Sequence, residues 1–113
     1  MEKFMLIFHG GPSVGASPEQ MQEHMGKWMA WIDKLNAAGK YVAGEPLLPG
    51  GKLISGKKKS VTDGPYTEGK EVVGGFFLIK AENMNEAVKI CDDYPDYEHG
   101  GSIQVRQVMK MEM

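Results

Sequence analysis

Residues 3–9 read Lys3-Phe4-Met5-Leu6-Ile7-Phe8-His9, and residues 71–81 read Glu-Val-Val-Gly-Gly-Phe-Phe-Leu-Ile-Lys-Ala. Successive side chains of an extended strand point to opposite faces, so each stretch presents apolar side chains on both faces. A strand of this kind is usually central in its sheet and covered on both sides. The two stretches therefore predict two central strands, and these decide the fold.

A long helix is predicted between them. Ser17 can cap it, Pro18 suits the first helical position, and Gln20 completes a capping box. Gly39 is a typical residue just beyond a helix end. An apolar stripe recurs at helical spacing, with members Met21, Met25, Trp28, Ile32 and Leu35.

The remaining strands read as edge strands or as a hairpin. Residues 41–48 are β-like, and Pro46 confines such a strand to an edge or a bulge. Residues 102–111 alternate between apolar and polar side chains, which is typical of a half-exposed strand. Residues 52–55 and 60–62 predict a short hairpin that encloses Gly56 and three lysines.

A second helix follows residue 81. Asn83 can cap it, with Glu86 at the third position of another capping box, and Pro95 bounds its end. Its expected buried stripe consists of Met84, Ala87, Val88 and Cys91. Cys91 is interpreted as a small core residue rather than a nucleophile.

The predicted element order is β-α-β-hairpin-β-α-β within one domain, residues 1–113. Two central and two edge strands match an α+β fold, the ferredoxin-like split βαβ arrangement with an antiparallel sheet of order 4-1-3-2. Two helices can cover only one face of such a sheet. The other face keeps Met5, Ile7 and alternate residues of 72–79, and a second copy of the same sheet is the simplest cover. We therefore expect a homodimer.

Composition excludes several classes of partner. The net charge is −2 with acids and bases interspersed, which argues against nucleic-acid binding. Lys57, Lys58 and Lys59 are interpreted as a solvated hairpin tip. The single cysteine cannot form an internal disulfide, and the first apolar run is too short for a signal peptide or a membrane span. A cytoplasmic protein without membrane contact is expected.

The segment Val61-Thr62-Asp63-Gly64-Pro65-Tyr66-Thr67-Glu68-Gly69-Lys70-Glu71 followed by Val-Val-Gly-Gly-Phe-Phe resembles the YCII-related proteins of the DGPF subgroup. That subgroup has an Asp-Gly-Pro-Phe stretch, and here Tyr66 replaces its phenylalanine. The segments 44–47 and 100–106 are also similar. The likeness runs in collinear order from residue 4 to about residue 108.

The resemblance implies a ferredoxin-like fold that dimerises into an α/β barrel. The wider family carries a histidine on the first helix and an aspartate near the end of the second, with enzymatic action expected between them. His24 falls at the helix position. The aspartate is left open among Asp92, Asp93 and Asp96. Pairing of DGPF relatives with extracytoplasmic-function sigma factors leaves a regulatory role open.

His24 and Asp63 are the candidate catalytic residues. His24 lies at the border of the first helix's apolar stripe, where a histidine suits acid–base chemistry; the alternative is a surface histidine beside an aromatic ring. Asp63 heads an Asp-Gly-Pro turn, where an aspartate commonly only caps the turn. Five further residues are candidate binding residues: His9, Trp28, Trp31, Glu45 and Arg106.

No cofactor or metal site is expected. The three histidines lack metal-ligand spacing, and the glycine pairs form neither a dinucleotide fingerprint nor a Walker loop. Two functions stay open. One is a cofactor-independent enzyme that uses His24 and a carboxylate on a small molecule. The other is a non-catalytic binding or regulatory module, which a purely apolar groove would favour and a converging histidine and carboxylate would disfavour.

Overall fold

A four-stranded antiparallel sheet organises the chain. The structure, a computed structural model, describes residues 1–10, 17–48, 50–64 and 72–111. The strands β1 (Glu2–His9), β2 (Tyr41–Pro46), β5 (Val73–Ala81) and β6 (Ser102–Gln107) lie in the order β2-β5-β1-β6. The two stretches with apolar residues on both faces are the central strands, and the predicted ferredoxin-like order 4-1-3-2 is confirmed.

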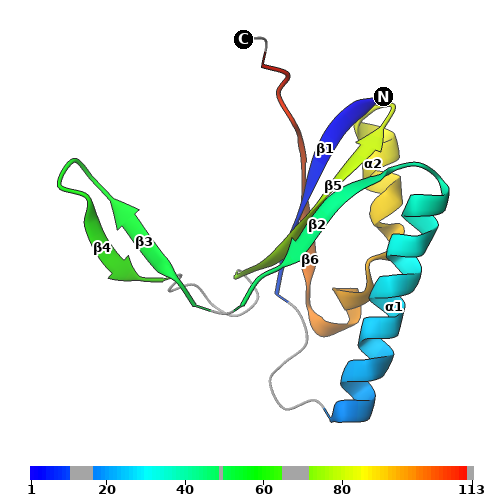
Figure 1. The fold of residues 1–113 in the computed structure, drawn as a ribbon, viewed down its shortest axis with the longest axis horizontal. Coiled ribbons are helices and arrows are strands. Elements are labelled where there is room, and N and C mark those ends of the chain that lie inside the picture. The colour runs from blue at the N-terminus through cyan, green and yellow to red at the C-terminus, as the bar shows by residue number, and fades with distance from the viewer. Residues whose placement is uncertain (11–16, 49, 65–71, 112–113) are drawn as a thin grey trace.

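Both helices lie on the same side of the sheet (Figure 1). They are α1 (Pro18–Ala37) and α2 (Met84–Ile90), and two 3-10 turns, η2 (Cys91–Asp93) and η3 (Pro95–His99), follow α2. In the parts of the chain that are described, no helix is long and apolar enough to cross a membrane. The core between helices and sheet contains Phe4, Leu6, Phe8, Trp31, Leu35, Phe77, Ile79, Ala81, Ala87, Cys91 and Tyr94.

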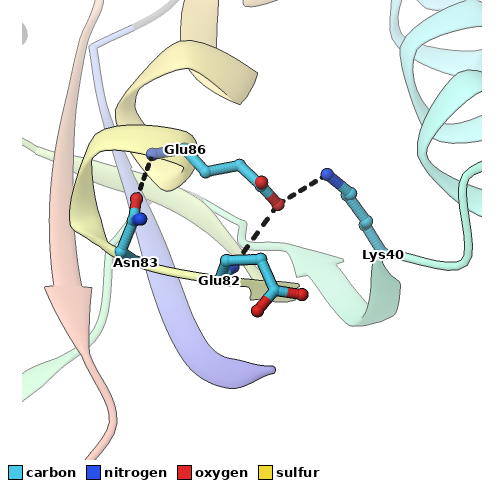
Figure 2. Close-up of polar contacts among 4 residues, drawn as sticks. All are labelled: Lys40, Glu82, Asn83 and Glu86. Carbon is cyan, nitrogen blue, oxygen red and sulfur yellow. Dashed lines mark hydrogen bonds and ion pairs between the residues drawn. The ribbon is translucent and has the colours of Figure 1, made fainter.

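The helix caps largely follow the sequence. Ser17 and Gln20 form the predicted capping box, and Gly39 has the positive φ of 71° expected beyond the end of α1. At α2, the Asn83 side chain accepts from the Glu86 N–H as predicted, but the Glu86 carboxylate turns elsewhere (Figure 2). It accepts from the Glu82 N–H and pairs with Lys40 at 2.5 Å, which ties the start of α2 to the loop after α1.

The predicted buried stripes are partly wrong. Met21 and Met25 on α1 are 61% and 62% exposed, and the buried side chains of this helix are Trp31 and Leu35. Met84 and Val88 on α2 are also exposed. Helical periodicity identifies an apolar face but not what lies opposite it. The N-terminal part of α1 extends past the sheet (Figure 1).

The predicted hairpin forms an arm that stands away from the sheet. Its strands, β3 (Lys52–Ser55) and β4 (Ser60–Asp63), pair with each other and extend on the side opposite the helices (Figure 1). All eight strand residues are exposed, including Leu53, Ile54 and Val61. The Cα radius of gyration is 15.9 Å, whereas a compact chain of this length has roughly 13 Å. The arm therefore presents exposed apolar side chains at Leu53, Ile54 and Val61.

The sheet face opposite the helices is also apolar at its centre. Met5 lies beside Leu78, and Ile7 lies beside Phe76, in the β1–β5 register. All four side chains are only half-buried. We call this 2 × 2 cluster the open-face patch.

Candidate functional site

A cavity of about 410 Å³ lies between α1 and the end of the sheet formed by β1, β2 and β5. Its lining is mostly apolar and aromatic, with a few polar groups. The lining residues are Phe8, Gly10, His24, Met25, Trp28, Met29, Ile32, Tyr41, Gly44, Glu45, Pro46, Gly74, Gly75, Phe77 and Asp96. A cavity of this size, with few polar groups converging on it, is typical of a small-molecule site.

His24 and Asp96 form the polar centre of the cavity wall. The Nε2 atom of His24 is hydrogen-bonded to Oδ1 of Asp96, although 72 residues separate them in the chain. The Asp96 side chain is 6% exposed and that of His24 is 23% exposed. A buried carboxylate is strongly unfavourable without a partner, so the imidazole is a required neighbour.

The 3-10 turn η3 holds Asp96 in place. Pro95 starts the turn, and Gly100 ends it with a positive φ of 77°. The Gly101 N–H then donates to the Asp96 carbonyl at 2.9 Å. Before the turn, the Tyr94 ring stacks on Phe8 of β1 with centroids 5.4 Å apart. The turn is thus fixed to the sheet on one side while Asp96 points to α1.

The indole of Trp28 meets the same histidine nitrogen. Its N–H donates to His24 Nε2 at 3.2 Å. One ring nitrogen carries either a proton or a lone pair, so it cannot donate to Asp96 and accept from Trp28 at once. The imidazole therefore has two competing arrangements, one with the proton on Nε2 and one with the proton on Nδ1. The arrangement with the proton on Nε2 keeps the hydrogen bond to Asp96 and leaves the Nδ1 lone pair able to accept a proton.

Tyr41 and Glu45 supply polar groups on the opposite wall. Both lie on β2 and line the cavity. Burial, and then the negative charge of Glu45, raise the pKa of the Tyr41 hydroxyl. The hydroxyl therefore stays protonated near neutral pH and can donate a hydrogen bond to a bound molecule.

The candidate residues fall into two groups. The structure brings Trp28 and Glu45 to the cavity together with His24. Trp31 is buried in the core behind the cavity. His9 and Arg106 lie on strands β1 and β6, opposite Ser102 and Met5, and neither lines the cavity.

Asp63 is not brought to His24. It ends β4 on the arm, its side chain is 73% exposed, and it pairs with Lys52 across the hairpin. The following residues of the DGPF-like segment, 65–71, lie outside the described residues. Of the three aspartates left open after the second helix, Asp92 and Asp93 are exposed, and Asp93 pairs with Lys34 at 2.7 Å.

Sequence reasoning missed Tyr41 and the rim methionines Met25 and Met29, which also line the cavity. It also missed His99, whose ring centroid lies 5.8 Å from that of His24. Asp96 and His99 are three residues apart, which is one full turn of a 3-10 helix. Pro95 before them was the available signal for such a turn.

Membership of a family follows from the sequence match. The family model of the YCII-related domain matches residues 3–112. The chain belongs to the YCII-related family. No curated protein matches this YCII-related chain.

Among solved structures, this YCII-related protein is similar to the 5-chloro-2-hydroxyhydroquinone dehydrochlorinase TftG from Burkholderia phenoliruptrix AC1100, in complex with 2,5-dihydroxybenzoquinone. The two chains are 19% identical, and the match covers 94% of this chain and 93% of the other, with a TM-score of 0.47.

Gly101 offers a test of how η3 is packed. A Cβ atom there would lie 2.5 Å from the Tyr94 hydroxyl oxygen and 2.9 Å from the Asp96 carbonyl oxygen. We expect Gly101→Ala to lower the free energy of unfolding by about 1–3 kcal/mol, the usual cost of overpacking. Gly26→Ala is the control, because its Cβ meets nothing within 4 Å and alanine favours a helix by about 1 kcal/mol. Urea unfolding measures both. If Gly101→Ala stabilises the protein as much as Gly26→Ala does, Gly101 is not closely packed against Tyr94 and Asp96.

Proposed function

We propose that this YCII-related protein binds a small planar molecule with an acidic hydroxyl group in the cavity and acts on it as a cofactor-independent acid–base enzyme. The observation that carries the proposal is the hydrogen-bonded pair of His24 and Asp96 in the wall of an aromatic cavity. A histidine and a carboxylate converging on a cavity favour catalysis over a purely apolar binding groove.

The shape and lining of the cavity support the ligand class. Phe8, Trp28 and Phe77 line it, and their rings are mutually edge-to-face at centroid distances of 4.9–5.6 Å. Flat apolar molecules pack well against such walls. Met25 and Met29 are flexible side chains that adapt to the outline of a ligand.

The pair supplies the proton chemistry. When Nε2 donates to Asp96, the neutral ring carries its lone pair on Nδ1. The ring can take a proton from the ligand hydroxyl there, and the Asp96 carboxylate then stabilises the imidazolium that forms. The Tyr41 hydroxyl on the opposite wall can donate to a second oxygen of the ligand.

4-Nitrophenol is a suitable probe, because it is planar, has an acidic hydroxyl group, and changes its visible absorbance on ionisation. We expect one probe molecule to bind per chain and its absorbance to shift toward the ionised form. Asp96→Asn should weaken binding about tenfold or more, because a hydrogen bond to a charged group contributes about 1.5–3 kcal/mol.

The matched control is Asp93→Asn, an aspartate three residues away on the exposed surface. It should bind the probe as the wild type does. His24→Gln provides a second variant on the stable helix α1 in case Asp96→Asn does not fold. Unchanged probe affinity and absorbance in both Asp96→Asn and His24→Gln would refute the acid–base role. Binding with no ionisation of the probe in the wild type would instead support a non-catalytic binding module.

We also infer a homodimer that packs open face against open face, as one YCII-related domain per copy. The open-face patch supports this, and the arm offers further apolar surface on the same side. We place the chain in the DGPF subgroup on the strength of its Asp63-Gly64-Pro65-Tyr66 stretch.

A further inference from the structure

Three residues beside the cavity carry metal-ligand atoms that converge. These are His24, Asp96 and His99, and one ligand atom from each lies within 4.8 Å of those of the other two. Asp96 and His99 come from the same turn of η3, and His24 faces them from α1. The spacing of histidines along the chain does not predict this set. His24 is far from Asp96 and His99 in the sequence and meets them only in the tertiary fold.

We propose that His24, Asp96 and His99 form a binding site for a divalent transition-metal ion of the Zn²⁺ class. Imidazole nitrogen and carboxylate oxygen are the ligands that such ions take in proteins, at about 2.0–2.2 Å for Zn²⁺. Two histidines and one carboxylate leave at least one coordination position open. Asp96 is buried and His99 is exposed, so an ion can enter from the solvent side past His99.

A bound ion would compete with the hydrogen bonds at Nε2 of His24. This nitrogen has one lone pair or one proton, so it cannot bind an ion while it donates to Asp96 or accepts from the Trp28 N–H. With Nε2 as the ligand atom, the metal-bound state and the hydrogen-bonded pair therefore exclude each other.

The chain's thiol is a poor competitor for the same ion. Cys91 is buried, and burial raises the pKa of its thiol to about 11, with a smaller contribution from Asp92. Metal ions bind the thiolate rather than the thiol. Binding by the chain should therefore depend on the histidines and Asp96 rather than on Cys91.

Calorimetric titration with ZnCl₂ tests the site on full-length, tag-free protein first treated with a chelator. We expect one Zn²⁺ per chain in the wild type. His99→Gln should weaken binding by at least about tenfold, since loss of even an outer-shell partner costs 10–100-fold. His99 is exposed and forms no part of the His24–Asp96 hydrogen bond, so this variant should fold and keep its affinity for 4-nitrophenol.

His9→Gln is the matched control, because His9 lies on β1 and outside the set of three. It should bind Zn²⁺ as tightly as the wild type. The proposal is overturned if the wild type takes up no Zn²⁺ at millimolar concentration, or if His99→Gln and His9→Gln bind it equally well. If the wild type binds Zn²⁺ but does not ionise 4-nitrophenol, the proposed function is refuted and the metal-site proposal is not.

Discussion

Leu78→Asp should convert the proposed homodimer into a monomer. Leu78 lies on the central strand β5, beside Met5, within the open-face patch. A carboxylate placed there must lose its hydration when the two sheets meet. A twofold interface carries the change twice. At about 2 kcal/mol or more for each copy, the dissociation constant should rise about a thousandfold or more.

Light scattering coupled to gel filtration at micromolar concentration measures this effect. Met84→Asp is the matched control, since it places the same charge on an exposed methionine of the helix side, at the start of α2. An aspartate in the first turn of a helix is favourable, so this variant should stay folded and dimeric. A dimer that survives Leu78→Asp would exclude the open face as the interface, and a monomeric wild type would exclude the homodimer altogether.

The sequence predicts the frame of this fold because local patterns determine it. Apolar residues on both faces identify β1 and β5 as central, and Pro46 identifies β2 as an edge strand. The Ser17 capping box marks the start of α1 within one residue. Each of these signals lies within a few neighbouring residues, so it can be recognised without knowledge of which segments meet in the tertiary fold.

The candidate site is less predictable because it depends on contacts between distant segments. His24 could be named from its place at the edge of a helix stripe. The choice among Asp92, Asp93 and Asp96 could not be made, because their exposure depends on how η3 packs against the sheet. Asp63 illustrates the opposite case: a distinctive motif drew attention to a residue that lies on the exposed arm. Motif strength alone does not indicate which side chains converge.

Phe8→Ala should produce the largest loss of stability among single substitutions in the core. Phe8 is 5% exposed and lies at the centre of the aromatic cluster. Its ring centroid is 4.9–5.9 Å from those of four other rings, which belong to Trp28, Trp31, Phe77 and Tyr94. Truncation of a buried phenylalanine costs about 3–5 kcal/mol, and whole domains are stable by only about 5–15 kcal/mol.

Phe8→Ala should also disturb the candidate site, because Phe8 connects the sheet to α1, which carries His24, and to the segment before η3, which carries Asp96. Its ring meets Trp28 of α1 on one side and stacks on Tyr94, two residues before Asp96, on another. Phe8→Leu keeps most of the apolar volume and should cost less than about 1.5 kcal/mol. Urea unfolding at one fixed protein concentration measures both variants, because stability of a dimer depends on concentration. A loss below about 1 kcal/mol in Phe8→Ala would mean that the aromatic cluster does not couple α1 and η3 through β1, and the alignment of His24 with Asp96 would then need another support.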